Sequence, residues 1–473
     1  MHILDLPPEL FHKILVSSIL ARCLKDPQRG TIRAFRLKLI SKAFYHAFQP
    51  ALFESRVLDN FNSDDSLRHW SIRKHYGGDQ LWHSYLVYRV GNETDPTVGR
   101  FVEIQLTAKE LCVATKTDYD KIVGGLCWLA LEIGARCPGQ RELWVDHSGR
   151  RNDPPNPRLN LLSAAAYFGH LGLAKQLLDD GCCPTQNDLF PSPMQLAAFA
   201  GNADMVILFQ EHLPDIEDEY TGDRFTDWKA NTGLGAIYGA ALRGDMDILR
   251  LAIDPPSRAT LHSSDFNGQK IGEVDPQSYA GRVLREAQSL TRSWEVFEYI
   301  TSLLRPSHPH STTFVAMNAE RGNIDMVQRL LDSEWLMDPR YPKDGNRYAV
   351  FARTSLIRAT RGFHEDIVDL LLKRGANPND DHMPERFGSA LSAAAAVGSM
   401  RMIRKLMEYG AKIDVHERQQ RLMLKKALLV EHTEMVNFFY DQGLLDRKCP
   451  AFLRKVIEEE GLESMLELLK KWE

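Results

Sequence analysis

Three glycines, spaced as Gly233-x-Gly235-x-x-x-Gly239, are the nearest this chain comes to a phosphate-binding loop. In a dinucleotide site, such glycines let the backbone approach a pyrophosphate at the N-terminus of a helix that follows a strand. The four residues before Gly233 (Lys-Ala-Asn-Thr) do not make a convincing strand, and residues 236–243 fit a short packing helix. The glycines therefore indicate helix packing rather than nucleotide binding.

Other residues that could carry catalysis are scattered. The sixteen histidines do not pair with cysteines at zinc spacing, and the patterns G-x-x-x-x-G-K-[ST], H-E-x-x-H and G-x-S-x-G are absent from the sequence. The acidic run at residues 458–460 is expected to begin the last helix, where negative charge favours the helix dipole. We therefore predict no enzyme activity, no catalytic residues, no cofactor and no bound metal.

The composition of the chain limits its expected binding partners and its cellular compartment. The chain has 473 residues, a net charge of −5 and 26% charged residues, which gives no general attraction to nucleic acid or to anionic membranes. The seven cysteines include no C-x-x-C pair, which suits a reducing compartment. Residues 1–10 contain two acids and two prolines instead of a signal peptide, and no apolar run approaches the roughly 18 residues of a membrane span. We expect a cytoplasmic or nuclear protein.

The elements that organise the chain are repeated helices. Nine segments place apolar residues at the fifth, sixth and ninth positions; they start at Gly169, Gly201, Gly244, Arg292, Gly322, Phe363, Gly398, Glu431 and Gly461. This spacing marks one face of a helix of about ten residues. A glycine follows twelve residues after four of the starts, at Gly181, Gly375, Gly410 and Gly443, where a helix end favours a left-handed residue. Repetition of this kind predicts a stack of supersecondary units.

A second pattern begins nine residues before several starts. The segments are Ser192-Pro-Met-Gln-Leu-Ala197, Thr354-Ser-Leu-Ile-Arg-Ala359, Ser389-Ala-Leu-Ser-Ala-Ala394 and, more loosely, Asn160-Leu-Leu-Ser-Ala-Ala165. Together with start spacings near 33, they resemble the T-P-L-H-x-A motif of ankyrin repeats from about Asn160 to Glu473. The resemblance implies an all-α ankyrin solenoid over residues 156–473 that binds proteins. The motif histidine is replaced by Ser163, Gln195, Ile357 and Ser392, which puts its inter-repeat hydrogen bonds in question.

Three long spacings indicate insertions at residues 213–231, 254–282 and 333–353. Loops on a rigid scaffold often carry binding residues, and aromatic side chains are favoured anchors. The candidate target-binding residues are Tyr220, Phe225, Trp228, Trp335, Tyr341 and Tyr348. The alternative is that these aromatic side chains fold back and cover the array.

The first 55 residues follow another pattern. Leu6-Pro-Pro-Glu-Leu10 precedes apolar residues at helical spacing, residues 24–32 read as a loop-like break, and residues 36–45 read as a second helix. The segment resembles an F-box, a three-helix module that docks on the Skp-type adaptor of an SCF ubiquitin ligase. The resemblance implies these adaptor-binding residues: Leu6, Pro7, Leu10, Ile14, Leu15, Leu39 and Phe44. The main alternative is that this segment is an amphipathic helix that caps the array. A second alternative is contact with nucleic acid, because residues 1–55 have a net charge of +4.

Residues 56–155 are expected to form a helical connector, either with or without degenerate repeats, and residues 119–135 read as a buried helix. Residues 153–157, rich in proline, mark the best boundary. The combined interpretation is the substrate-recognition subunit of an SCF-type ligase: the F-box-like module holds the adaptor and the array holds an unknown target protein. The alternative is an ankyrin scaffold without a ligase link. An exposed apolar patch around Leu10 and Ile14 would favour the first.

Overall fold

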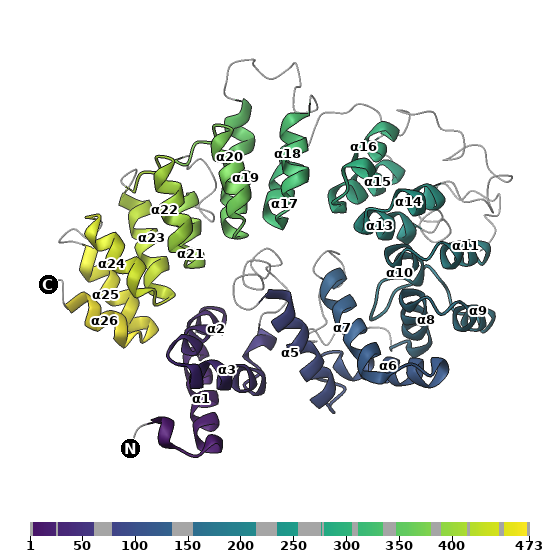
Figure 1. Cartoon of the computed structure of the whole chain (residues 1–473), viewed down its shortest axis with the longest axis horizontal. Coiled ribbons are helices and arrows are strands. Elements are labelled where there is room, and N and C mark those ends of the chain that lie inside the picture. The colour runs from purple at the N-terminus through teal and green to yellow at the C-terminus, as the bar shows by residue number, and fades with distance from the viewer. Residues whose placement is uncertain are drawn as a thin grey trace. The chain divides into compact units, whose positions relative to one another are not determined.

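The computed structural model describes residues 3–24, 27–60, 78–134, 155–213, 234–253, 276, 279–304, 311–333, 347–379, 389–413, 417–443 and 449–470. Within these residues every assigned element is a helix. The fold class is therefore all-α, as the sequence predicted. The chain divides into two compact units: unit 1 comprises Met1–Leu81 and His310–Glu473, and unit 2 comprises Trp82–Pro309. Figure 1 shows the helices coloured along the chain.

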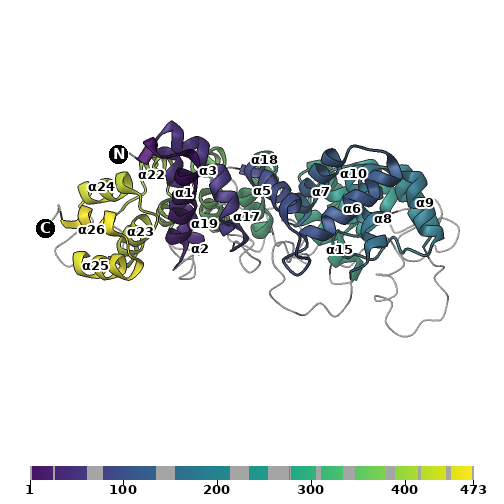
Figure 2. The ribbon, with the colours of Figure 1, turned by 90° about the horizontal axis from the view of Figure 1, so that it is seen from below.

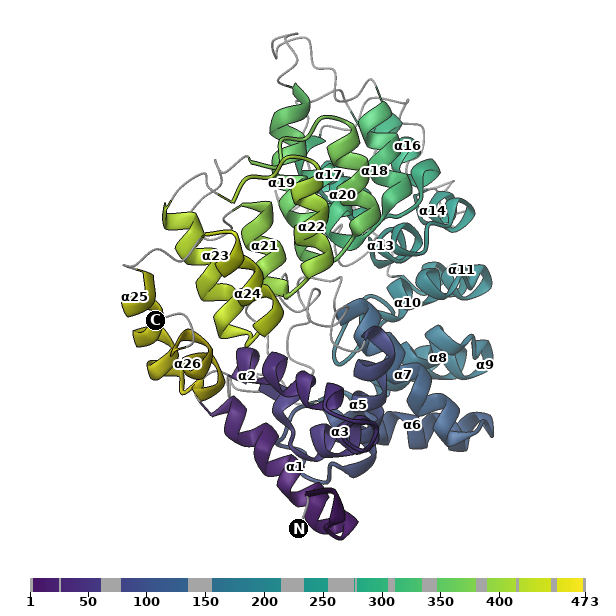
Figure 3. The ribbon, with the colours of Figure 1, turned by 60° about the vertical axis from the view of Figure 1, so that its left-hand side comes forward.

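The N-terminal part of unit 1 is a small helical cluster, named here the N-terminal module (residues 3–60). Its elements are η1 Ile3–Asp5, α1 Pro8–Cys23, α2 Pro27–Ala34, η2 Phe35–Leu39, α3 Lys42–Glu54 and η3 Val57–Asn60. Helix α1 packs against both α2 and α3, and these helices are drawn in purple in Figure 3.

Two expectations for the N-terminal module were wrong. The segment read as a loop-like break contains helix α2. The expected single helix over residues 36–45 is divided, because Ser41 is extended and its side chain accepts a hydrogen bond from the Phe44 N–H at 3.4 Å. An N-cap serine of this kind starts a new helix, so η2 ends before it and α3 follows it.

The rest of the described chain consists mainly of consecutive helix pairs. In unit 2 they are α8 Pro157–Phe168 with α9 Leu171–Asp179, α10 Pro193–Ala200 with α11 Ala203–Glu211, α13 Leu234–Arg243 with α14 Met246–Ile253, and α15 Tyr279–Leu290 with α16 Trp294–Leu303. In each pair the two helices contact one another, and the first helices of successive pairs also pack together.

Unit 1 continues the same arrangement. Its pairs are α17 Ser311–Arg321 with α18 Ile324–Asp332, α19 Arg347–Arg361 with α20 Glu365–Lys373, α21 Ala390–Val397 with α22 Met400–Glu408, α23 Glu417–Leu429 with α24 Thr433–Asp441, and α25 Cys449–Glu460 with α26 Glu463–Lys470. The acidic run at residues 458–460 therefore closes α25 and does not begin the last helix. Its position follows from the glycine joint at Gly461, which separates the two helices.

The nine predicted repeat helices all exist, because a second helix follows each of the nine starts. The three apolar positions of each copy are buried almost throughout. Leu173 and Leu466 are half-buried, and the side chain of Leu469 lies outside the described residues. The apolar face that the spacing predicted is therefore the face that packs.

Glycine has two separate uses in these pairs. Gly169, Gly201 and Gly398 end first helices in the left-handed conformation, with φ of 78°, 80° and 76°. Gly239 lies inside α13, where a Cβ atom would sit 2.2 Å from the carbonyl oxygen of Gln195 on α10. Gly239 is one of the three glycines that resembled a nucleotide-binding loop. In the structure, its missing side chain allows α13 to approach α10 closely.

The first residue of the T-P-L-H-like segment caps a helix in two segments and does not in a third. Ser192 and Ser389 accept hydrogen bonds from the N–H groups of Gln195 and Ser392, at 3.3 and 3.2 Å. Thr354, by contrast, lies in the middle of α19, because that helix already begins at Arg347. The residues between have no glycine or proline to stop the helix.

The connector is helical where the structure describes it. It contains α5 Gly78–Asn92, α6 Phe101–Thr115 and α7 Tyr119–Gly134. The buried helix expected over residues 119–135 is α7, whose residues Ile122, Leu126 and Leu129 have no exposed surface. Helix α6 packs on both α7 and α8, and Figure 2 shows these three helices together.

Candidate interaction surfaces

Helix α1 is apolar on two faces. Its inner face carries Leu15, Ile19 and Cys23, all buried against the rest of the N-terminal module. Its other side, named here the α1 outer face, consists of Leu10, Ile14, Leu20 and Leu24, all exposed to solvent. At 3.6 residues per turn these four side chains share one stripe of the helix. Burial within the N-terminal module explains why the inner face is apolar. It does not explain the apolar residues of the α1 outer face.

Aromatic packing holds α1 in place. The Phe11 and Phe44 rings meet edge to face, with centroids 5.0 Å apart, and Phe35 and Phe48 pack at 5.4 Å. Gly30 on α2 supplies a second close contact, since a Cβ atom there would lie 2.5 Å from Cα of Cys23. The module core thus fixes which face of α1 points outward.

The seven predicted adaptor-binding residues divide into two groups. Leu10 is 49% exposed, Ile14 is 40% exposed and Leu39 is 75% exposed. Pro7 is also exposed and Leu6 is half-buried. Leu15 and Phe44 are buried in the module core, at 2% and 9% exposure, so their surfaces serve packing within the module.

Six exposed apolar residues near these positions did not enter the sequence prediction: Ile3, Leu4, Leu20, Leu24, Ile40 and Tyr45. Leu20 and Leu24 extend the α1 outer face, and Ile40 and Tyr45 lie close in sequence to Leu39 around the start of α3. Helical spacing from Leu10 and Ile14 could have identified Leu20 and Leu24. Ile40 and Tyr45 lie on either side of the N-cap residue Ser41, so the predicted single helix over residues 36–45 could not indicate their exposure.

Polar side chains tie neighbouring repeats together at one recurrent place, the residue before the second helix. Asn202 Nδ2 donates to the carbonyl oxygen of Ala166 at 3.0 Å, and His364 Nε2 donates to that of Glu320 at 2.9 Å. His432 is hydrogen-bonded to the backbone of Gly398. Each bond joins a repeat to the one before it.

The two serines that replace the motif histidine, Ser163 and Ser392, differ in their hydrogen bonding. Ser163, which stands at that position, donates from Oγ to the carbonyl oxygen of Pro191 at 3.1 Å. Ser392 Oγ is buried and has no hydrogen-bond partner among the described residues. The bonds of Asn202, His364 and His432 join neighbouring repeats at a different position from that of the motif histidine.

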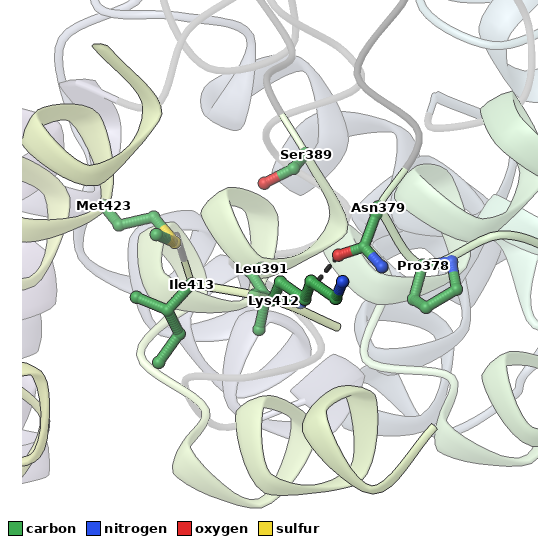
Figure 4. A pocket seen from close by; sticks show the side chains of 7 residues that line it. All are labelled: Pro378, Asn379, Ser389, Leu391, Lys412, Ile413 and Met423. Atoms are coloured by element: carbon green, nitrogen blue, oxygen red, sulfur yellow. Dashed lines mark hydrogen bonds between the residues drawn. The ribbon is translucent and has the colours of Figure 1, made fainter. Parts of the chain in front are cut away.

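A small pocket lies between two repeats of unit 1. Its lining residues, drawn in Figure 4, are Pro378, Asn379, Ser389, Leu391, Lys412, Ile413 and Met423. The cavity has room for about one water molecule, whereas small-molecule sites usually measure roughly 300–1,000 Å³. Asn379 bridges the two repeats, because Nδ2 donates to the Gly410 carbonyl at 2.9 Å and Oδ1 accepts from the Lys412 N–H at 2.6 Å. The pocket is therefore a junction between repeats.

The described residues also bear on metal binding, nucleophilic chemistry and membrane insertion. The described part of the chain holds no group of three or more His, Cys, Asp or Glu suited to a metal ion. Burial raises the pKa of the Cys127 thiol to about 12, so this cysteine is not a nucleophile at neutral pH. None of the described helices is long and apolar enough to cross a membrane.

The predicted target-binding residues are not placed by the structure. Tyr220, Phe225, Trp228, Trp335 and Tyr341 lie outside the described residues. Tyr348 belongs to the first turn of α19, and its side chain is likewise not described. Their role stays a prediction.

Comparison with known proteins agrees with the repeat architecture. A family model of the ankyrin repeat matches residues 353–382, which include α20 and residues 353–361 of α19. Among solved structures, the chain is similar to the crystal structure of the human ASB11 ankyrin repeat domain: identity is 15%, coverage is 57% of this chain and 96% of that one, and the TM-score is 0.24. No curated protein matches the sequence. Residues 353–382 are thus an ankyrin repeat, within an all-α array of helix pairs that indicates a protein-interaction module.

Proposed function

We propose that this protein is the substrate-recognition subunit of an SCF-type ubiquitin ligase. The observation that carries the proposal is the α1 outer face. A folded three-helix module that buries one side of α1 and leaves Leu10 and Ile14 in solvent has a surface suited to a protein partner. The resemblance of residues 1–55 to an F-box supports a Skp-type adaptor as that partner.

The contact residues follow from exposure. Leu6, Pro7, Leu10, Ile14 and Leu39 can reach an adaptor directly, and Leu20 and Leu24 extend the same face. Leu15 and Phe44 act indirectly, because they hold α1 and α3 in position from inside the module. A module of about 55 residues buries little surface by itself and gains stability from a partner.

The repeats of residues 156–473 supply the target-binding part of the proposal. Ankyrin-type pairs present their first helices and connecting loops as one extended surface for another protein. The aromatic insertions remain the candidate contacts. The chain itself makes no bond: binding both adaptor and target raises the effective concentration of target lysines near the ligase.

The decisive experiment measures binding of the full-length protein to a purified Skp-type adaptor. A double variant, Leu10→Asp with Ile14→Asp, places two charges on the α1 outer face and should lower affinity at least about 100-fold, because a charge in an apolar interface is strongly unfavourable. Val113→Asp is the matched control, since Val113 is an 82%-exposed apolar residue on α6 of unit 2.

The outcomes separate the two candidate functions. The receptor function is supported if the control binds the adaptor as tightly as the wild type and the double variant loses binding. Circular dichroism should show that the helical content of both variants is unchanged. If the intact, folded protein binds no adaptor, the receptor proposal fails, and the ankyrin scaffold without a ligase link becomes the better interpretation.

A further inference from the structure

Glu431 stands at a joint where most repeats have glycine. It connects α23 to α24 with φ of 52°, in the left-handed region. The equivalent joints hold glycines with φ between 70° and 81°: Gly169, Gly201, Gly244, Gly322, Gly398 and Gly461. A left-handed glutamate is strained where glycine is not. The turn itself therefore gives no reason for a glutamate.

The backbone of this joint is nevertheless the ordinary one. The His432 N–H donates to the carbonyl oxygen of Ala427 at 3.0 Å, as the Ser399 N–H donates to that of Ala394 at 3.1 Å in the preceding repeat. The repeat keeps its geometry in spite of the substitution. The difference at position 431 is thus confined to the side chain, and its contacts show what it does.

The carboxylate of Glu431 accepts hydrogen bonds from two separate segments of unit 1. Oε2 accepts from Arg22 Nη1 of α1 at 2.7 Å, and Oε1 accepts from Ser464 Oγ of α26 at 3.1 Å. The Glu431 side chain is only 15% exposed, so solvent screens the Arg22 pair less than it screens a surface pair. One side chain therefore links the N-terminal module with two consecutive repeats.

Phe363 provides a useful contrast. It is also left-handed, with φ of 61°, at the joint between α19 and α20. It has no carboxylate and no ion pair to another element is possible there. A left-handed conformation at a joint is therefore no sign of an ion pair by itself, whereas the carboxylate of Glu431 forms one with Arg22.

Arg22 is held in position from within the N-terminal module. Its carbonyl oxygen accepts from Arg33 Nη2 at 3.4 Å, and a Cβ atom on Gly30 would lie 2.3 Å from that same oxygen. Gly30 thus lets α2 approach the last turn of α1 closely. The positive charge of Arg36 also lies near enough to His432 to contribute to the lowered pKa of that histidine, after burial. Two arginines of the module therefore face the joint that contains Glu431.

The contact leaves the α1 outer face free. At about 100° per residue, Arg22 lies roughly a quarter to a third of a turn around α1 from Ile14 and Leu10. It is on the side of the buried residues Leu15 and Ile19. A partner on the outer face and Glu431 on the other side can therefore bind α1 together.

We propose that Glu431 is a docking residue that fastens the N-terminal module to the last two helix pairs, α23–α24 and α25–α26. Arg22 supplies the charge on the module side and Ser464 supplies the second anchor. The module and these repeats then move as one body. The proposal is independent of the adaptor and holds whether or not the receptor function is correct.

A crosslinking experiment tests the contact directly in the full-length protein. Arg22→Lys introduces an amine that a carbodiimide can join to a carboxylate in contact with it. Mass spectrometry should then detect a crosslink between residues 22 and 431. The ion pair between Lys405 and Asp369, 2.6 Å apart, gives an internal positive control. Adding Glu431→Gln should remove only the first crosslink. Formation of the control crosslink without the 22–431 crosslink overturns the proposal.

A second variant separates docking from local folding. Glu431→Gly relaxes the left-handed joint and removes the carboxylate. Hydrogen exchange should become several-fold faster at the end of α1 and in α2, while the amides of α24 keep or gain protection. Unchanged exchange in α1 and α2 would mean that Glu431 serves only its own repeat, and the proposal would be wrong.

Discussion

His432 performs two tasks with one neutral ring. Its Nδ1 accepts the N–H of Met435 at 3.3 Å and caps α24, and the ring also bonds to the backbone of Gly398. Burial lowers its pKa first, and Arg36 lowers it further, while Glu434 acts in the opposite direction. A protonated ring has no acceptor at Nδ1, so protonation would remove the cap.

This residue predicts a pH dependence of stability with a definite sign. In the unfolded chain a histidine has a pKa near 6.5, and in the folded chain that of His432 is lower. On acidification the unfolded state binds the proton first, so the free energy of unfolding falls as pH drops below about 6.5 toward the folded pKa. His432→Asn keeps an acceptor and a donor without titrating. Urea unfolding at pH 7.5 and at pH 5 measures the free energy of unfolding of both proteins. From pH 7.5 to pH 5, the stability of the variant relative to the wild type should rise. An equal difference between the two proteins at both pH values would contradict the expectation.

At the scale of elements, the approach of helices depends on individual glycines. Gly239 of α13 faces backbone atoms of α10, whereas Gly124 of α7 has nothing within 4 Å of the position of an added Cβ. Both lie within helices of unit 2. They therefore form a matched pair for testing whether close packing or helix propensity dominates.

Gly239→Ala and Gly124→Ala are expected to change stability in opposite directions. The first should lower the free energy of unfolding by roughly 1–3 kcal/mol, because the carbonyl of Gln195 is backbone and must move with its helix. The second should raise it by about 0.5–1 kcal/mol through helix propensity. Chemical denaturation of both variants under identical conditions measures the two changes in the free energy of unfolding. Changes of the same sign and size would refute the prediction.

Elements were predictable where their own residues specify them. The nine second helices follow from apolar positions at helical spacing, and burial of those positions bears this out. Helix α2 escaped prediction because its sequence is polar and contains Pro27 and Gly30. Its packing depends on contact with α1 across Gly30, which local sequence does not reveal. The α1 outer face was predictable in part, since only its first two residues belong to the F-box-like pattern.

At the scale of the whole molecule, contacts between helix pairs connect neighbours. Helix α21 packs on α19 before it and on α23 after it, and the same holds along each unit. Stability in such an array is a sum of repeat terms and nearest-neighbour terms. A core substitution should therefore disturb its own surroundings more than distant repeats.

Leu406→Ala tests this locality. Leu406 of α22 is fully buried, and its truncation should cost about 2–5 kcal/mol. Hydrogen exchange should accelerate in α21–α24, while α8–α11 in unit 2 retain wild-type protection. Equal acceleration throughout would indicate a single cooperative fold instead of separable repeats.

The recurrent left-handed joints bear on how such a chain can lengthen. Gly169 and Gly201 are 32 residues apart and have φ values of 78° and 80°. A segment cut between two such joints begins and ends with the same local backbone conformation, so gene duplication can add a copy, or deletion can remove one, without rebuilding the turn on either side. A charged residue at a joint, such as Glu431, breaks this interchangeability. The repeat that contains Glu431 is suited to one position in the chain. A duplicate of it inserted elsewhere would lack Arg22 as the partner of its carboxylate.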